Sequence, residues 1–212
     1  MTAPTPESNG PVTEATAPTS PVTEAVILCA GASTRMGRPK GLMPTRATGA
    51  APCLLRAHVD AFAAAGLKVT VVLGAAADRH RAVLPPGVRV VHNANWASTS
   101  LTDSADLALD GLGAVLLTPV DVPPATPDTL RMLLATPGSA VVCHGGRDGH
   151  PVRLAPPHPR GVRLDLRLTD ARRIEVSDPH CVRNLNYPED HAEWLAAKER
   201  AAPVYSASQN GG

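Results

Sequence analysis

The chain has 212 residues, of which 43% are hydrophobic and 18% are charged, and its formal net charge is +1. This length provides one domain with a substantial core and leaves little room for a second domain of full size. The balanced charge and the aromatic content of only 2% argue against a nucleic-acid partner, which needs basic surface and stacking rings.

The four cysteines and eight histidines are dispersed along the chain. Neither a C-x-x-C pair nor an H-E-x-x-H motif occurs, so the sequence predicts neither a structural zinc site nor a disulfide framework. The apolar runs are all shorter than the ~18 residues of a membrane-spanning helix. The first residues, MTAPTPESNG, lack the basic and apolar parts of a signal peptide. We therefore expect a cytoplasmic protein with no membrane partner.

The expected domain follows a segment rich in proline and threonine. Residues 1–24 contain the sequence PVTE twice and have too few apolar side chains to build a core, so we expect a disordered tail. The predicted domain spans 25–200. The last residues, 201–212, are expected to form a flexible C-terminus.

Within this domain, apolar runs alternate with helical patterns. The runs AVILCA, VTVVLG, VRVVH, AVLLTPV and SAVVCH are expected to form buried strands at 25–30, 69–74, 88–92, 114–120 and 139–144. Helices are predicted at 52–65, 103–110, 127–135 and 188–199, the third with Thr126 as its N-cap and Pro127 in its first turn. The alternation predicts a single-domain α/β fold with three layers and a mainly parallel, Rossmann-like sheet. Ligands of such sheets bind at the carboxyl ends of the strands.

The loop after the first predicted strand carries both glycines and cations. It reads AGASTRMGRPK over residues 30–40. The Walker A pattern fails because five residues separate the two glycines and arginine follows them, and the dinucleotide pattern fails because residue 33 is serine. Glycine backbone amides together with Arg35 and Lys40 suit an anion. A solvated surface loop has the same composition, so the pattern alone leaves both interpretations open.

The stretch LCAGASTRMGRPKGLMP resembles the signature L-[AG]-[AG]-G-x-S-x-R-M-G-x-x-K-x-L of the MobA-like nucleotidyltransferases, which are similar to sugar-1-phosphate nucleotidyltransferases. The resemblance implies a fold of the nucleotide-diphospho-sugar transferase type, in which this loop wraps the triphosphate of an NTP. Arg35 and Lys40 are then expected to be catalytic, because they neutralise the triphosphate. The implied nucleotide-binding residues are Leu28, Ala30, Gly31, Ala32, Ser33, Gly37 and Lys40.

Two further segments imply a metal site. TPVDVPPATPDTL is similar to the family's L-x-D-x-P segment and implies that Asp121 is catalytic and holds Mg²⁺. A lone carboxylate at the end of a buried strand also suits a hard cation on chemical grounds. NLNYPEDH resembles the N-x-N-T-P-E-D box and implies Asn184 as a second, weaker metal ligand, with Tyr187 in place of the usual threonine. An asparagine here would equally serve as a helix cap.

The same comparison implies residues that contact the acceptor substrate. VVHNANWASTSLTDS resembles a family segment that lines the acceptor side of the cleft, and RDGHPVRL resembles the G-x-x-G-H-P-V segment seen mainly in the cytidylyltransferase branch. With the asparagine box they give Asn93, Ser104, His150 and Asn186 as the expected acceptor-binding residues. For His150 the alternative is a turn residue in front of Pro151.

Together, these resemblances imply a Mg²⁺-dependent nucleotidyltransferase. It would transfer an NMP from an NTP to a phosphorylated small molecule, such as molybdopterin cofactor, and release pyrophosphate. LCAG and GRPK are closer to the cytidylyl branch of the family than to the guanylyl branch, so CTP is favoured over GTP. Two alternatives remain open: a sugar-phosphate nucleotidyltransferase, and a non-catalytic, nucleotide-binding regulator. The sequence does not identify the acceptor or the oligomeric state.

Overall fold

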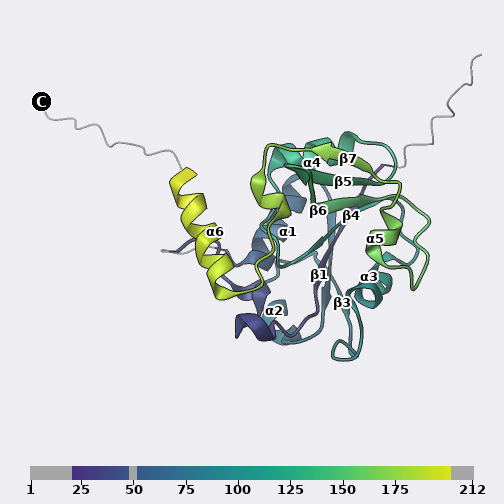
Figure 1. The fold of residues 1–212 in the computed structure, drawn as a ribbon. Coiled ribbons are helices and arrows are strands. Elements are labelled where there is room, and N and C mark those ends of the chain that lie inside the picture. Colours follow the sequence, from purple (N-terminus) through teal and green to yellow (C-terminus); the bar gives the residue numbers. More distant parts are fainter. Residues whose placement is uncertain (1–20, 48–51, 202–212) are drawn as a thin grey trace, which may run out of the picture.

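The structure is a computed structural model that describes residues 21–47 and 52–201 (Figure 1). In these residues seven strands form one sheet in the order β3-β2-β1-β4-β6-β5-β7. Their bounds are Glu24–Cys29 (β1), Lys68–Leu73 (β2), Arg89–His92 (β3), Val115–Pro119 (β4), Ala140–His144 (β5), Arg147–Leu154 (β6) and Arg172–Glu175 (β7). β6 runs antiparallel to both of its neighbours, and every other neighbouring pair is parallel. The predicted mainly parallel α/β fold is confirmed.

Helices cover both faces of the sheet, as the strand–helix alternation predicts. On one face, α1 (Leu54–Ala64) and α4 (Pro127–Ala135) pack against the apolar cluster that contains the odd-numbered residues of β1. On the other face, α3 (Leu101–Leu109) and α5 (Leu164–Arg167) pack against the cluster that contains its even-numbered residues. This division follows from the alternation of side chains along a strand. A short helix, α2 (Ala77–Arg81), follows β2.

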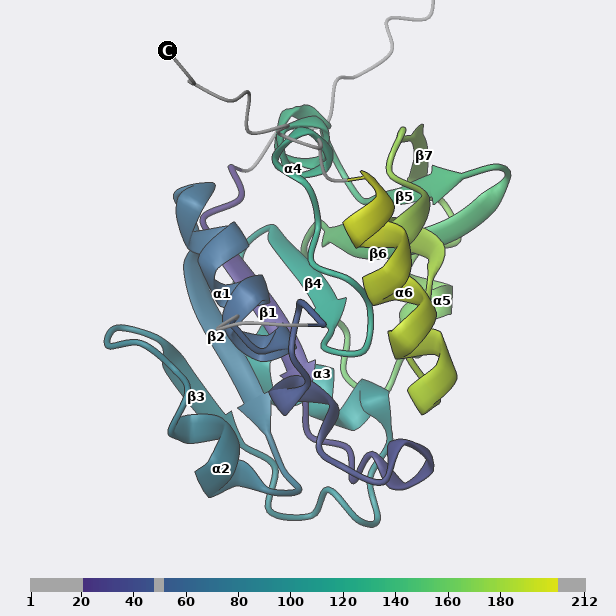
Figure 2. The same ribbon diagram turned by 90° about the vertical axis from the view of Figure 1, so that its left-hand side faces the viewer.

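The last helix, α6 (Pro188–Ala201), lies on the same side of the sheet as α1 (Figures 1 and 2). Its Trp194 and Leu195 form a separate apolar cluster with Met36, Met43, Leu54 and Leu185. The cluster therefore joins the C-terminal helix to the loop that follows β1 and to the start of α1. Through it, α6 supports the region where the sequence places its candidate site.

Helix signals in the sequence agree with the observed helix starts. Thr126 accepts a hydrogen bond from the Thr129 backbone, and Pro127 opens α4, as predicted. α3 begins at Leu101, two residues before the predicted start, because Ser100 and Asp103 form a reciprocal capping box. None of the described helices is long and apolar enough to cross a membrane.

Three expectations about the strands need correction. The strand at 88–92 is present as β3, but its prediction as a buried strand is wrong, because it is an edge strand paired only with β2 and its residues are exposed or half-buried. The sequence analysis did not predict β6 or β7, whose residues RDGHPVRL and RRIE are polar and lack a clear apolar run. His150 lies inside β6, so the alternative of a turn residue there is wrong.

The predicted terminal segments lie largely outside the described residues. Of the expected tail, residues 21–24 are described: Val22 packs against the core, and Glu24 is the first residue of β1. Ala201 ends α6. The rest of the expected C-terminus, 202–212, and residues 1–20 lie outside the described part of the chain.

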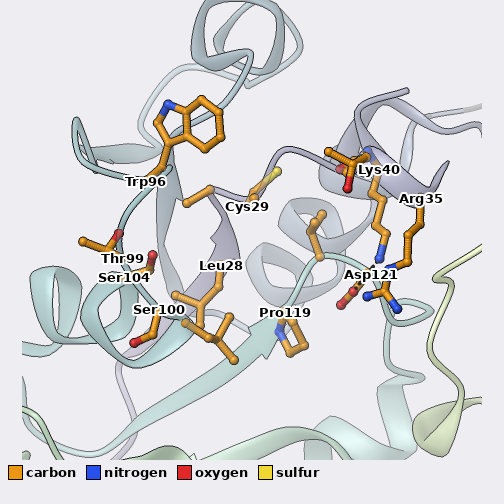
Figure 3. A pocket seen from close by; sticks show the side chains of 16 residues that line it. Leu28, Cys29, Arg35, Lys40, Trp96, Thr99, Ser100, Ser104, Pro119 and Asp121 are labelled. Atoms are coloured by element: carbon orange, nitrogen blue, oxygen red, sulfur yellow. Dashed lines mark hydrogen bonds and ion pairs between the residues drawn. The ribbon is translucent and has the colours of Figure 1, made fainter. Parts of the chain in front are cut away.

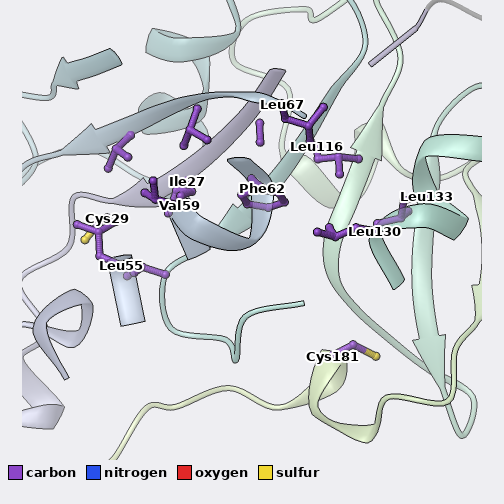
Figure 4. Close-up of a cluster of buried hydrophobic side chains, with 14 of the residues drawn as sticks. Ile27, Cys29, Leu55, Val59, Phe62, Leu67, Leu116, Leu130, Leu133 and Cys181 are labelled. Atoms are coloured by element: carbon purple, nitrogen blue, oxygen red, sulfur yellow. The ribbon is translucent and has the colours of Figure 1, made fainter. Parts of the chain in front are cut away.

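Phe62→Ala is expected to destabilise the fold by about 3–5 kcal/mol. Phe62 is the chain's one phenylalanine and is 1% exposed, packed among Ile27, Val59 and other apolar side chains between α1 and the sheet (Figure 4). Truncation leaves a cavity that the surrounding strands cannot collapse to fill. Urea unfolding measures the change. Leu166→Ala, at a position 61% exposed, is the control and should stay within about 0.5 kcal/mol of wild type.

Candidate active site

The candidate site lies where the strand order reverses. β1 pairs in parallel with both β2 and β4, so the chain leaves β1 toward one side and β4 toward the other. The Val120 backbone amide donates to the Leu28 carbonyl at 3.0 Å, which ties the start of one outgoing loop to the end of β1. Such a switch point opens a crevice at the carboxyl ends of the strands.

The loop after β1 has one defined conformation. Ser33 and Gly37 both adopt left-handed backbone angles, with φ of 56° and 71°. The Ser33 hydroxyl accepts a hydrogen bond from the Lys40 backbone amide at 3.0 Å, and Met36 is buried in the cluster formed with α6. The left-handed region is costly for a residue other than glycine, and such strain is typical of functional sites. The loop therefore points its cations in fixed directions.

The Lys40 ammonium joins two distant segments of the chain. Nζ donates to Asp121 Oδ2 and to Asn186 Oδ1, each at 2.8 Å. Lys40 is only 9% exposed, so these bonds compensate for the water that the ammonium loses. The Leu185 backbone amide also donates to the Asp121 carbonyl, at 2.6 Å. Loop, strand end and C-terminal segment thus meet at one cation.

The second cation of the loop faces the same C-terminal segment. The Arg35 guanidinium lies over the Tyr187 ring, 5.5 Å from its centroid, at a distance typical of a cation–π contact. Asn186 and Tyr187 therefore hold Lys40 and Arg35, respectively. The sequence analysis noted Tyr187 as a departure from the usual threonine, and its ring supplies a contact that threonine lacks.

A cavity of about 270 Å³ opens beside this cluster. Figure 3 shows Lys40, Arg35 and Asp121 together at one end, and Trp96 with several hydroxyl groups at the other. Trp96 can pack close to β1 because residue 74 is glycine: a Cβ there would lie 2.5 Å from the Ala30 carbonyl oxygen and 2.6 Å from Trp96 Cβ. The cavity thus has a cationic end and an aromatic end.

Most of the expected nucleotide-binding and catalytic residues meet at this cavity. It is lined by Leu28, Ala30, Gly31, Ser33, Arg35, Lys40 and Asp121, and by Ser104 from the expected acceptor set. Ala32 and Gly37 belong to the same loop but are exposed and are not part of the cavity wall. The geometry brings the two predicted loop cations and the predicted carboxylate into one place.

Asn93, an expected acceptor-binding residue, is not part of the cavity wall. It is buried, and its side-chain amide donates to Thr99 Oγ1 at 2.8 Å and to Ser104 Oγ at 3.0 Å. Its Oδ1 accepts from the Asn95 backbone at 3.0 Å. These hydrogen bonds fix the conformation of the loop that contains Trp96.

The sequence analysis did not single out several residues of the cavity wall. These are Cys29, Thr34, Trp96, Thr99, Ser100, Leu101, Pro119 and Val120. Four of them lie in the stretch NWASTSL, which the sequence analysis compared with the family segment as a whole. A tryptophan in a chain with only two was the available signal.

Two histidines, the buried His58 and the half-buried His150, lie close to Asp121. The His58 Nε2 donates to the Val122 carbonyl at 2.9 Å, and burial lowers the pKa of His58 to about 4. Burial likewise lowers the pKa of His150 to about 4, and the His150 Nδ1 has no hydrogen-bond partner among the described residues. Both rings are therefore neutral at pH 7. The Asp121 carboxylate is paired with the Lys40 ammonium and not with a charged histidine.

The free energy of unfolding is expected to fall as the pH is lowered from about 6.5 to about 4. In this window the unfolded chain binds a proton at His58 while the folded chain does not, so acid favours unfolding. The contribution of His58 is on the order of 3 kcal/mol. Urea unfolding across this pH range tests it. His58→Gln keeps a donor for the Val122 carbonyl and should show a shallower slope; an equal slope in both proteins would contradict the assignment.

The oxygen atoms around Lys40 fit a divalent cation. Asp121 and Asn186 each direct an oxygen at the same cationic position, and Mg²⁺ is commonly bound by one or two carboxylates completed by substrate phosphates. Within residues 21–47 and 52–201, no three His, Cys, Asp or Glu side chains are placed to hold a metal. Asn184, the expected second ligand, is exposed and lines a different cavity. Of the two asparagines, Asn186 is the one that contacts Lys40.

Comparison with protein families gives one match. The model of the MobA-like NTP transferase domain matches residues 25–178. These residues contain β1 apart from Glu24, the loop with Lys40, Asp121 and β6. No curated protein matched the sequence.

Comparison with solved structures supports the same fold. The chain is 26% identical to Rv0371c from Mycobacterium tuberculosis H37Rv, with a TM-score of 0.66 and coverage of 84% of this chain and 100% of that one. A manganese complex of Rv0371c matches with 25% identity, a TM-score of 0.64 and the same coverage. The CTP:phosphocholine cytidylyltransferase LicC from Streptococcus pneumoniae is 14% identical, with a TM-score of 0.63 and coverage of 84% and 99%. This last likeness concerns the fold alone.

Proposed function

Because the chain belongs to the MobA-like NTP transferase family, we propose that it transfers an NMP from an NTP to a phosphorylated small molecule and releases pyrophosphate. One observation carries the proposal: the buried Lys40 ammonium is held by Asp121 and Asn186 beside a cavity at the switch point of the sheet. A triphosphate entering the cationic end offers Lys40 stronger, fully charged partners than the amide oxygen of Asn186.

In the proposed reaction an oxygen of the acceptor phosphate attacks the α-phosphorus of the NTP. The bond from the α-phosphorus to the bridging oxygen breaks, and pyrophosphate leaves with the bonding electrons. Lys40 and Arg35 neutralise the charge that develops on pyrophosphate, and the rigid loop holds them in place before the reaction begins. No general base is required, because the attacking oxygen already carries negative charge. Positioning two anions in line supplies the rest of the rate enhancement.

A divalent cation at Asp121 would supply further charge neutralisation at the phosphates when bound. We propose Mg²⁺ as the physiological ion, and Asp121 with the Asn186 oxygen as the protein's donors. The manganese complex of Rv0371c supports the use of a divalent ion. The chain's own contribution is the placement of these oxygens: the Leu185 amide ties its segment to the Asp121 backbone carbonyl, and Lys40 bridges the two side chains until the triphosphate draws the ammonium away.

We propose CTP as the preferred nucleotide and molybdopterin cofactor as the first acceptor to test. The support for CTP is the similarity of LCAG and GRPK to the cytidylyl branch. Trp96 at the far end of the cavity offers a ring for stacking against a base. Sugar phosphates are the second class of acceptor, because related enzymes of this fold use them.

The experiment is a panel of reactions followed by pyrophosphate release. The protein is incubated with Mg²⁺, each of the four NTPs, and either molybdopterin cofactor or one of a set of sugar phosphates. We expect release only with an acceptor present, and fastest with CTP. Nucleotide binding by calorimetry without turnover on any acceptor would instead favour a non-catalytic regulator, a reading that the neutral oxygens of Asn184 and Asn186 support.

A further inference from the structure

The Lys40 ammonium already lies in the position of a cation between Asp121 and Asn186. Its Nζ is 2.8 Å from Oδ2 of Asp121 and 2.8 Å from Oδ1 of Asn186. Figure 3 shows the lysine and Asp121 together at the cationic end of the cavity. The same two oxygens are the proposed donors to a divalent ion. They cannot hold both cations at one point, because an ammonium and a divalent ion repel each other at such short range.

The two oxygens are placed by backbone contacts that do not include Lys40. The Leu185 amide donates to the Asp121 carbonyl at 2.6 Å, which joins the segment before α6 to the end of β4. In the next residue, the Asn186 amide donates to the Asp190 carboxylate at 2.9 Å. Leu185 itself is fully buried in the apolar cluster that it forms with α6. The pair of oxygens should therefore stay assembled when the ammonium is removed.

The ammonium is held firmly by these partners. The side chains of the ion pair are 11% exposed for Lys40 and 26% exposed for Asp121. Solvent and salt screen a shielded pair of this kind less than a pair on the surface. A divalent ion that enters alone must displace the ammonium and offers it no new partner, so the lysine would lose the bonds that compensate for its lost hydration.

A triphosphate offers the ammonium the partner that a lone metal ion lacks. An ammonium has three N–H groups, and among the described residues Lys40 gives two of them to Asp121 and Asn186. Lys40 also lines the cavity, as Arg35 does. A phosphate at this end can therefore accept from the third N–H first and then draw the ammonium away from the two oxygens, because its charge makes it the stronger acceptor.

We propose that Lys40 occupies the divalent-cation position between Asp121 and Asn186 until an NTP binds, so that Asp121 becomes available to a metal ion only with the nucleotide or after it; this inference rests on the proposed nucleotidyl transfer. The lysine then has two successive sets of partners, the protein oxygens before the NTP binds and the phosphates afterwards. Binding of the NTP and of the metal is coupled, because the movement of Lys40 toward the phosphates frees the oxygens.

The test is Mn²⁺ binding to the full chain without nucleotide, measured by electron paramagnetic resonance of the free ion. Lys40→Met removes the charge and keeps an unbranched side chain, and it is expected to bind Mn²⁺ at least about tenfold more tightly than wild type, a gain of ~1.4 kcal/mol. Lys40→Gln is a second variant with the same expected direction, and urea unfolding identifies which variants are folded. Adding Asp121→Asn to Lys40→Met should abolish the gain, because a hard cation depends on carboxylate charge.

Two controls separate this competition from a general change of charge. Lys68→Met removes an exposed lysine at the start of β2 and should leave Mn²⁺ affinity unchanged. Arg35→Met removes the other predicted cation of the cavity but leaves the Lys40 bridge in place. It should raise Mn²⁺ affinity less than Lys40→Met does, because its charge acts on the ion through partly screening solvent.

Three results would overturn the inference: equal Mn²⁺ affinity in wild type and in the folded Lys40 variants, an equal gain in Arg35→Met, and a gain that survives Asp121→Asn. The outcome is separable from that of the proposed reaction. If removal of the ammonium tightens Mn²⁺ binding but no acceptor gives pyrophosphate, the competition stands and the proposed transfer fails. If pyrophosphate is released but Mn²⁺ binding does not change, only the competition fails.

Discussion

Lys40→Ala is expected to lower kcat by about 10²–10³-fold, with folding unaffected. The ammonium contacts both Asp121 and Asn186, and in the proposed reaction it turns to the charge that forms on pyrophosphate. Removing the ammonium is therefore expected to destabilise the transition state much more than it weakens binding of the NTP. The pattern to look for is therefore a large fall in kcat with a smaller change in KM for the NTP.

Pyrophosphate release at saturating NTP measures this effect, and urea unfolding monitors the fold. The matched control is Lys68→Ala, which removes an exposed lysine at the start of β2. Lys40→Arg adds a second comparison. The Lys40 nitrogen lies 2.8 Å from one oxygen of Asp121 and from one oxygen of Asn186. A guanidinium keeps the positive charge, but its planar fork cannot place one nitrogen at that point. Near-normal kcat in Lys40→Ala would remove Lys40 from the mechanism.

Much of the site was predictable because it depends on short-range signals. The loop with Lys40 and the segment with Asp121 each follow an apolar run, and the ends of parallel strands meet at one edge of the sheet. The same holds for α4, whose N-cap and first-turn proline are adjacent in sequence. Local signals located these groups, and the resemblance to a known family gave them their expected roles.

The contacts between distant segments could not be predicted in the same way. The resemblance assigned Asn184 to the metal and Asn186 to the acceptor, but the folded chain turns Asn186 toward Lys40 and leaves Asn184 in a different cavity. β6 and β7 were missed because their polar residues are tolerated near the sheet's edge and in antiparallel pairing, where alternation replaces a continuous apolar run. The cavity that contains Asn184 requires Arg147 of β6 and the segment before α6 to meet, which no local pattern encodes.

Asp121→Asn is expected to lower kcat by at least about 10²-fold and to weaken binding of Mn²⁺ in the presence of CTP. The variant keeps the size of the side chain and an oxygen that can still accept from Lys40, while the negative charge is lost. A hard cation gains much of its affinity from carboxylate charge. The two readouts, turnover and Mn²⁺ binding followed by electron paramagnetic resonance, therefore report on separate roles of the same carboxylate.

The combination of results decides what Asp121 does. Loss of both turnover and Mn²⁺ binding supports a carboxylate that holds the divalent ion. Loss of turnover with unchanged Mn²⁺ binding would mean that Asp121 acts by positioning the Lys40 ammonium, since the 2.8 Å ion pair would be the only interaction weakened. Asp60→Asn, at an exposed site paired with Arg56 in α1, is the matched control and should change neither readout. Wild-type behaviour of Asp121→Asn in both would show that the carboxylate has neither role, because an amide at that position would then serve the reaction equally well.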